Sequence, residues 1–468
     1  MPRALPPVVF VPGLPGSALI HRQDDRRIFF RARESDNSRW KKQFLPALQG
    51  PDDPAAEDAV VAGEPIATLF RAREPLLDVA PGKQAASLYD LLRHWGYREQ
   101  DDRLRPVGWD WRLPVDHPTT LDRLRRALVD LHAEQGARVV VLAHGAGGLV
   151  VRALLEAEPE LCERLALLVT FGVPWAGCLE PLRHLTAKAA FPPFDRKETR
   201  AIFGHSWALW EMLPPAPDGA DLADDEGPLD LFSAAGAPAS PLTANGWIGK
   251  SKAEEPLRRR ARQAAARLSR SRRELALGGR RLAVWNLAGW GIPTVVAARL
   301  GDEGELELEE GPDGDGVVPR RAAAWLAGEG VVHWWLPLGG FTPAAHPILW
   351  RGRAARELLR RALTGEGAPH HVHAAVDPQD VEGDPPEIRI RFVAQGEGGE
   401  PLAGAAVHLF DRSDPRPFGG DGRLTLAVHR ERWQSARRDV RQLRIRITWT
   451  DGDRERRKDL TVLAGGRK

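Results

Sequence analysis

The clearest hydrophobic pattern in this 468-residue chain is a short apolar run between two helical patterns. Residues 139–142 are Val, Val, Val and Leu, a run typical of a strand covered on both faces of a parallel sheet. Before it, leucines at helical spacing end at Gly136, a predicted C-cap. After it, residues 149–156 combine helix formers with an apolar stripe, and residues 165–171 are a second apolar run. This order predicts a right-handed parallel unit.

Strand and helix patterns alternate along most of the first 365 residues. Further strands are predicted at residues 8–11, 281–286, 294–300 and 331–336, and helices at residues 84–97 and 347–363. Residues 24–75 have a charged and irregular pattern, and residues 180–280 carry Pro-rich, Trp-bearing helical segments. We therefore predict an α/β domain with a doubly wound, mostly parallel sheet over residues 1–365, and a helical cap inserted at about residues 180–280.

The C-terminal region has a different pattern of short strands. Residues 387–393 and 443–449 alternate apolar and basic side chains with period two, as half-exposed antiparallel strands do. Residues 407–410 and 424–428 predict further strands, separated by turns rich in Gly, Pro and Asp. We expect residues 366–468 to form an all-β sandwich.

Composition limits the classes of function. Lys and Arg total 66 against 64 Asp and Glu, so no bulk attraction to nucleic acid is expected. Cys162 and Cys178 have neither metal-binding nor disulfide spacing, which predicts two buried thiols in a reducing compartment and no metal or cofactor. No apolar run approaches the roughly 20 residues that cross a bilayer, and the N-terminal apolar stretch is too short for a signal peptide. We expect a cytoplasmic protein.

The turn between the predicted strand and helix carries the main chemical clue. Residues 143–147 read Ala-His-Gly-Ala-Gly. In a G-x-S-x-G elbow, a serine at the third position is presented as a nucleophile above the sheet. Here Gly145 takes that position, where it tolerates positive φ without strain, and Gly147 lets the helix start pack closely on the strand. The sequence therefore predicts that the turn is kept while the hydroxyl is absent.

A candidate acid and a candidate base follow this turn. Gly145, Asp315 and His346 stand in the chain order of elbow, acid and histidine that α/β-hydrolases have. Further blocks in the same register are residues 11–17 (VPGLPGS), 109–112 (WDWR), 172–174 (GVP), 288–294 (AGWGIPT) and 314–319 (GDGVVP). With these blocks, about residues 7–360 closely resemble the lecithin:cholesterol acyltransferase family.

The resemblance implies a function for each of these positions. Family members have a serine where Gly145 stands, the acid at Asp315 and the general base at His346. It also implies that the backbone N–H groups of Leu14 and Ala146 form the oxyanion hole. Members transfer or hydrolyse the acyl chains of phospholipids and related esters, and their cap covers an apolar acyl pocket. Without the serine hydroxyl, no acyl-enzyme can form.

Three classes of function remain open. The favoured one is an acyl-ligand-binding pseudoenzyme of acyltransferase or acylhydrolase lineage, in which Gly145 has impaired catalysis. The second is an active esterase or phospholipase that uses a water held by His346, or another hydroxyl such as that of Ser17 or Ser206. The third is a scaffold or partner-binding protein. Ser206 lacks a preceding apolar strand, so we interpret it as a decoy, and Ser17 as a residue that stabilises its turn.

Other polar residues have both a supporting and a simpler interpretation. Asp110 and Arg112 can form a buried ion pair beneath the site or a solvated pair on a loop. His144 is expected to pack or hydrogen-bond beneath the turn. The basic helix predicted at residues 257–275 can attract anionic lipid headgroups, or simply form the solvated face of the cap.

The C-terminal region has a resemblance of its own. Residues 400–407 and 420–426 resemble transthyretin-like regulatory domains attached to carboxypeptidases. This resemblance implies an accessory module that carries no chemistry.

Overall fold

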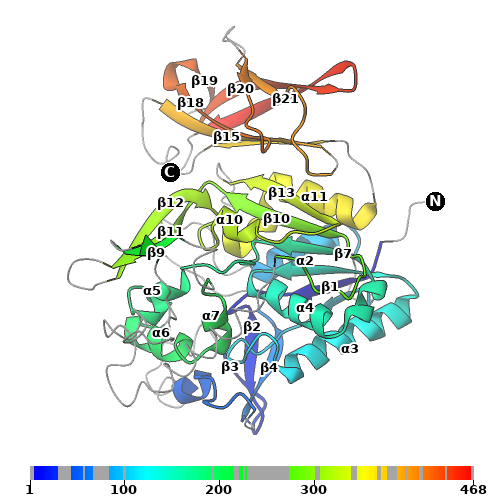
Figure 1. Cartoon of the computed structure of the whole chain (residues 1–468), viewed down its shortest axis with the longest axis vertical. Coiled ribbons are helices and arrows are strands. Elements are labelled where there is room, and N and C mark those ends of the chain that lie inside the picture. The colour runs from blue at the N-terminus through cyan, green and yellow to red at the C-terminus, as the bar shows by residue number, and fades with distance from the viewer. Residues whose placement is uncertain are drawn as a thin grey trace.

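The structure is a computed structural model. It describes residues 5–29, 44–55, 58–66, 84–97, 102–191, 194–214, 221–224, 227–228, 273–300, 306–338, 345–365, 370–376, 387–396, 398–409, 415–437 and 440–464. Figure 1 shows a layered α/β body with a set of strands of its own at the C-terminal end.

The centre of the body is a six-stranded sheet in which all neighbouring strands are parallel. In chain order its strands are β1 (Val8–Val11), β5 (Leu104–Pro106), β6 (Val139–His144), β7 (Leu165–Phe171), β10 (Val284–Trp290) and β13 (Val331–Pro337). Their spatial order is β13-β10-β7-β6-β1-β5. Every residue of β1 and β6 is buried, as the continuous apolar runs predict.

Helices cover both faces of this sheet. They are α2 (Gln84–His94), α3 (Pro118–Gln135), α4 (Ala146–Ala157) and α11 (Arg353–Thr364), with the short segments η2 (Pro159–Arg164) and α10 (Arg320–Ala323). Val9 and Val11 share a core with α3 and α4, whereas Val8 and Phe10 share a core with α2 and α11. The sheet is therefore doubly wound, as predicted, and Gly136 ends α3 in the left-handed conformation at φ 57°.

The helix predicted at residues 347–363 is two elements, so that prediction is wrong. A 3-10 segment, η4 (His346–Arg351), precedes α11. Ile348 is non-helical at φ −145°, and Gly352 is extended at ψ 141°. Gly352 breaks the helix because glycine has the lowest helix propensity after proline. The break places His346 at the start of a separate turn.

Residues 24–75 are more regular than their charged pattern indicates. A small antiparallel sheet pairs β2 (Ser17–His21) with β3 (Arg26–Phe29) and β4 (Val60–Pro65). The charged residues of β3 lie at its exposed end while Ile28 and Phe29 are fully buried. Long-range pairing with β2, which local sequence does not show, explains these strands.

The described part of residues 180–280 contains three short helices and two short strands. They are α5 (Pro181–Leu185), α6 (Arg196–Phe203), α7 (Trp207–Glu211), β8 (Asp221–Asp224) and β9 (Gly227–Pro228). The two strands extend an antiparallel pair, β11 (Ile292–Leu300) and β12 (Leu306–Gly314), into a four-stranded sheet. Residues 257–272 of the predicted basic helix lie outside the described residues.

Two antiparallel sheets enclose one core in the C-terminal region. One contains β14 (His371–Val376), β15 (Glu387–Gln395) and β18 (Arg423–His429); the other contains β16 (Ala406–Leu409), β17 (Arg416–Pro417), β19 (Gln434–Arg437), β20 (Val440–Asp451) and β21 (Arg454–Ala464). Phe392 of the first sheet and Ile445 of the second belong to the same buried cluster. The relation to transthyretin-like domains stays a prediction.

Side chains of the C-terminal strands cover the edge strand β13. Gln395 accepts a hydrogen bond from the Trp335 N–H at 2.9 Å and donates to the His333 carbonyl at 2.9 Å. The His371 ring lies 2.8 Å from the Trp335 carbonyl through Nε2. Arg391 is also buried, and it donates to the carbonyl of Leu338, the residue that follows β13. The prediction that β15 is half-exposed is therefore wrong for part of its length. Contact with β13 buries the second face of β15.

Candidate active site

The turn at Gly145 has the geometry of a strand-to-helix elbow. β6 ends at His144 and α4 begins at Ala146, so Gly145 alone makes the turn. Its φ of 48° and ψ of −130° lie in a region that glycine adopts more readily than any other residue. The Gly145 N–H donates to the Phe171 carbonyl at 3.0 Å, which ties the turn to the end of β7.

Close packing beneath the elbow requires a glycine at position 147. A Cβ at Gly147 would lie 2.4 Å from the Pro12 carbonyl oxygen and 2.6 Å from that of Val11. The first turn of α4 therefore rests directly on the end of β1, which the sequence analysis expected. This contact fixes the direction in which α4 leaves the sheet.

Asp315 and His346 lie next to each other at the same edge of the sheet. His346 Nδ1 is 2.9 Å from Asp315 Oδ2, and the other carboxylate oxygen accepts the N–H groups of Val317 and Val318 at 3.1 and 2.8 Å. Only 1% of the Asp315 side chain and 11% of the His346 side chain are exposed. A carboxylate at Nδ1 holds the proton there, so the lone pair of a neutral ring lies on Nε2.

The free edge of the His346 ring points at the elbow. A Cβ built on Gly145 would lie 3.0 Å from His346 Nε2. The structure therefore brings together the three positions that the sequence analysis placed in one site, although they are far apart in the chain. A histidine, its carboxylate partner and the elbow lie together, and the elbow carries no side chain.

Two glycines make room for the acid and the base. Gly172, at φ 55°, follows β7; a Cβ there would lie 2.5 Å from Asp315 Oδ2 and 2.9 Å from His346 Nδ1. A Cβ at Gly289 would lie 2.8 Å from the Asp315 Cβ. Both glycines belong to the motif blocks GVP and AGWGIPT, but their position beside Asp315 and His346 is not evident from the sequence.

His144 supports the base from below. Its Nε2 lies 2.7 Å from the His346 backbone oxygen, and the two rings are 4.7 Å apart. Burial, and to a smaller extent the neighbouring His346, lower the pKa of His144 to about 3. The ring is therefore neutral at physiological pH, and its Nε2–H donates to the carbonyl. His144 thus hydrogen-bonds beneath the turn, as expected, and joins the end of β6 to the start of η4.

Leu14 and Ala146, which the sequence analysis expected to form an oxyanion hole, follow two neighbouring strands of the sheet. β1 and β6 are parallel neighbours, so the turns that follow them meet at one edge of the sheet. The Gly13 Cα is 3.6 Å from the Cβ position of residue 145, and the turn after it closes through a hydrogen bond from the Gly16 N–H to the Gly13 carbonyl. Ala146 is the first residue of α4, where N–H groups have no intrahelical acceptor.

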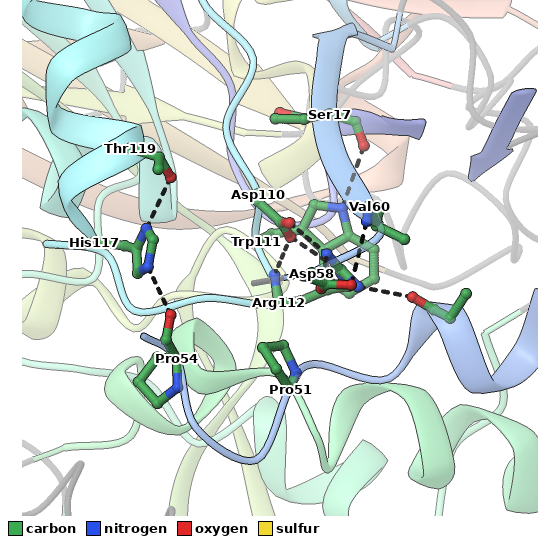
Figure 2. A network of polar contacts seen from close by, with 12 residues as sticks. Ser17, Pro51, Pro54, Asp58, Val60, Asp110, Trp111, Arg112, His117 and Thr119 are labelled. Carbon is green, nitrogen blue, oxygen red and sulfur yellow. Dashed lines mark hydrogen bonds and ion pairs between the residues drawn. The ribbon is translucent and has the colours of Figure 1, made fainter. Parts of the chain in front are cut away.

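The Asp110–Arg112 pair is buried rather than solvated. Arg112 Nε and one terminal nitrogen donate to the two Asp110 oxygens at 2.9 and 2.6 Å, and Asp58 lies 2.7 Å from the same guanidinium (Figure 2). None of the Arg112 side chain is exposed. Asp58 is a partner that the sequence analysis missed, because it is distant in the chain.

This ion pair holds the segment that supports the turn after β1. Trp109, directly before the pair, donates its indole N–H to the Pro12 carbonyl at 2.8 Å. The Trp109 backbone N–H donates to the Ser17 hydroxyl at 2.9 Å, so this hydroxyl has the structural role that the sequence analysis favoured. Residues 109–112 therefore fix the chain on both sides of Leu14.

The second candidate hydroxyl is also engaged. Ser206 caps α7: its Oγ accepts from the Leu209 N–H at 3.3 Å and donates to the Trp111 carbonyl at 2.6 Å. Ser206 is fully buried and lies outside any elbow. Its surroundings agree with the decoy interpretation.

Glu180 is a partly buried acid near the site that the sequence analysis missed. It precedes α5 and pairs with Arg183 at 3.1 Å. Burial raises the pKa of Glu180 to about 7, while the charges of Arg183 and His346 oppose the rise. No local motif indicates this residue, because its burial depends on the packing of distant segments.

Two further sequence expectations concern the thiols and membrane spans. Cys162 and Cys178 are free and buried, as expected. None of the helices in the described ranges combines the length and apolar character that a membrane span needs.

The doubly wound parallel sheet, with a glycine elbow at its edge and an acid–histidine pair beside it, defines an α/β-hydrolase fold. Residues 70–223 match the family model for lecithin:cholesterol acyltransferase, and this segment is thus similar to that family. The matched segment includes Gly145, whereas Asp315 and His346 lie beyond it.

The chain is also similar to parts of two acyltransferases. The lysosomal phospholipase A and acyltransferase of Mus musculus is 26% identical over 137 residues, which are 27% of this chain and 33% of that protein. The phosphatidylcholine-sterol acyltransferase of Gallus gallus is 28% identical over 111 residues, 22% of this chain and 27% of that protein. The match to the mouse protein thus spans about a third of its length. The structure titled as the Tle4-Tli4 complex has a TM-score of 0.46 at 15% identity, and covers 77% of this chain and 98% of that chain.

Proposed function

We propose that this protein binds an acyl ester of the phospholipid type at the Gly145 elbow and cannot form a serine acyl-enzyme. The similarity of residues 70–223 to an acyltransferase family supports the ligand class. The names of the mouse and chicken relatives point to phospholipid and sterol acyl transfer by those proteins. In this chain the elbow itself supplies no nucleophile.

The proposal depends mainly on the orientation of the His346 ring. His346 Nε2 lies 3.0 Å from the Cβ position of Gly145, and Asp315 holds the other side of its ring at 2.9 Å. A purely structural histidine has no reason to keep a buried carboxylate partner and a free nitrogen at the elbow. The pair therefore fits a site whose nucleophile was lost and whose other groups remain.

The lost hydroxyl has a large chemical cost. In a serine protease, removal of the serine lowers turnover by roughly a million-fold, while about 10³ to 10⁴ over the uncatalysed rate survives. That residual comes from binding and from stabilisation of the oxyanion. We therefore expect ester binding by the wild-type chain without covalent turnover.

Restoring the hydroxyl tests the catalytic half of this proposal. We expect Gly145→Ser to react with a fluorophosphonate probe at residue 145 and to hydrolyse a nitrophenyl octanoate ester at least about 100-fold faster than the wild type. The new Cβ must displace the His346 ring by a few tenths of an ångström, and positive φ costs about 1 kcal/mol, so the variant should also be less stable.

Gly136→Ser is the matched control. It also places serine on a left-handed glycine, at φ 57°, with no atom within 4 Å of the new Cβ and far from the acid–histidine pair. Labelling of Gly136→Ser as strong as that of Gly145→Ser would contradict the proposal, as would a folded Gly145→Ser variant that stays unreactive.

Ligand binding is tested separately on the wild type. Dioctanoylphosphatidylcholine below its micelle concentration should raise the midpoint of thermal unfolding, because a ligand that binds only the native state stabilises it. Glycerophosphocholine, which has the same headgroup and no acyl chain, should not. Equal effects of the two compounds would assign recognition to the headgroup and contradict acyl binding.

A further inference from the structure

The retained acid–histidine pair faces the elbow without a side chain between them. We infer that this site transfers an acyl group directly from the bound ester to an alcohol in a single displacement, with His346 as the general base and no acyl-enzyme. The inference rests on the proposed binding of an acyl ester. It differs from serine chemistry in one testable respect, which is that donor and acceptor must occupy the site together.

The distance between His346 Nε2 and the elbow leaves room for an acceptor hydroxyl. His346 Nε2 lies 3.0 Å from the point where a side chain of residue 145 would begin. That separation is a normal hydrogen-bond length between an oxygen and a nitrogen. Because Gly145 adds no atoms, an acceptor hydroxyl can take the place at the base that a serine hydroxyl takes in a G-x-S-x-G elbow.

The groups that remain at the site can account for each step of a direct transfer. The acceptor hydroxyl gives its proton to Nε2 while its oxygen bonds to the ester carbonyl carbon. Negative charge on the carbonyl oxygen faces the N–H groups of Leu14 and Ala146. The bond from that carbon to the leaving oxygen then breaks, and Nε2 returns the proton to this oxygen. Donor ester and alcohol become product ester and a new alcohol, and His346 and Asp315 end as they began.

Burial at the site favours an apolar alcohol over water as the acceptor. Only 11% of the His346 side chain and 1% of that of Asp315 are exposed, so an acceptor bound at the base is largely removed from bulk solvent. An acceptor with an apolar body gains binding energy by burial and arrives with its hydroxyl already positioned. Such positioning raises the effective concentration of the acceptor by orders of magnitude.

The test uses the full chain with dioctanoylphosphatidylcholine as donor and 1-octanol as acceptor. We expect octyl octanoate to form at rates that depend on both concentrations, with intersecting double-reciprocal lines, and no octanoyl adduct on the intact protein. His346→Gln should lower the rate at least about 100-fold while the variant still binds the donor. Gly145→Ser should give parallel lines and a covalent adduct.

The outcomes separate this inference from the proposed function. Octanoate without octyl octanoate would overturn direct transfer in favour of hydrolysis, and an octanoyl adduct on the wild type would overturn it in favour of an unrecognised nucleophile. A wild type that is stabilised by the donor but yields neither product would also overturn it, while leaving ester binding intact. If the donor does not stabilise the wild type, both the proposed ester binding and the direct transfer are contradicted. Gly136→Ser, distant from the site, should match the wild-type rate.

Discussion

The two halves of the candidate site are preserved in different ways. The elbow half, formed by β6, Gly145 and α4 and supported through Trp109 by the Asp110–Arg112 pair, lies within the segment that is similar to the acyltransferase family, and its turn residue carries no side chain. The acid–base half, Asp315 and His346, lies outside that segment and keeps its side chains in contact. The backbone geometry of the elbow and the side-chain contact of the acid–histidine pair therefore depend on different parts of the chain.

Different forces hold these two halves. The elbow depends on glycines and on strand pairing, so loss of a hydroxyl there leaves the backbone intact. The acid–base half depends on buried hydrogen bonds, because Asp315 accepts two backbone N–H groups and the His346 ring. We therefore expect different losses of stability when each half is disrupted. In the elbow half the loss comes from a buried charge without a partner, and in the acid–base half it comes from steric overlap.

The largest loss is expected on the elbow side, from Arg112→Met. This change leaves buried Asp110 without its cation, and an unpaired buried charge costs roughly 3 to 5 kcal/mol. Urea unfolding measures the loss. Arg126→Met is the control: its side chain is 70% exposed and pairs with Asp122 on the surface, so a loss of at most about 1 kcal/mol is expected. Equal losses would show that the buried pair does not brace this half.

A smaller loss, about 3 kcal/mol, is expected on the acid–base side from Gly172→Ala. The new methyl group would lie 2.5 Å from Asp315 Oδ2, so the acid must move away. Gly136→Ala has nearly the same φ and open space around its Cβ, so it should lose only the backbone cost of about 1 kcal/mol. Unfolding of both variants in urea gives the difference. A Gly172→Ala variant no less stable than Gly136→Ala would mean that the pair is loosely held.

These comparisons show which parts of the molecule were predictable. The elbow, its flanking strands and its helix are contiguous, so hydrophobic periodicity indicates them directly. The positions of Asp315 and His346 followed from a family resemblance rather than from local pattern. Asp58, Glu180 and the strands of residues 24–75 were missed, because each depends on contacts between segments distant in the chain.

The smallest expected effect concerns His144, which joins the two halves. Its pKa is 6.5 when unfolded and about 3 when folded, so between these values the unfolded state binds the extra proton. Stability should therefore fall as the pH drops below about 6.5, by about 2 kcal/mol at pH 5 relative to pH 8 from this residue. Urea unfolding of wild type and His144→Gln at both pH values isolates this contribution.

The pH 8 measurement serves as the internal reference for this comparison, since the ring is neutral there in both states. The variant should lose less stability than the wild type on acidification. An identical loss in both proteins would place the acid sensitivity elsewhere, for example at His184, whose pKa burial lowers to about 4.

The contact between β13 and the C-terminal strands has a practical consequence. Gln395 and His371 occupy backbone groups of Trp335 that would otherwise lie open at the rim of the parallel sheet. A shortened protein ending near residue 365 would expose these groups to other molecules, and uncovered rims of this kind promote self-association. Attempts to isolate the α/β body by truncation should therefore yield aggregates, even though that body contains Gly145, Asp315 and His346.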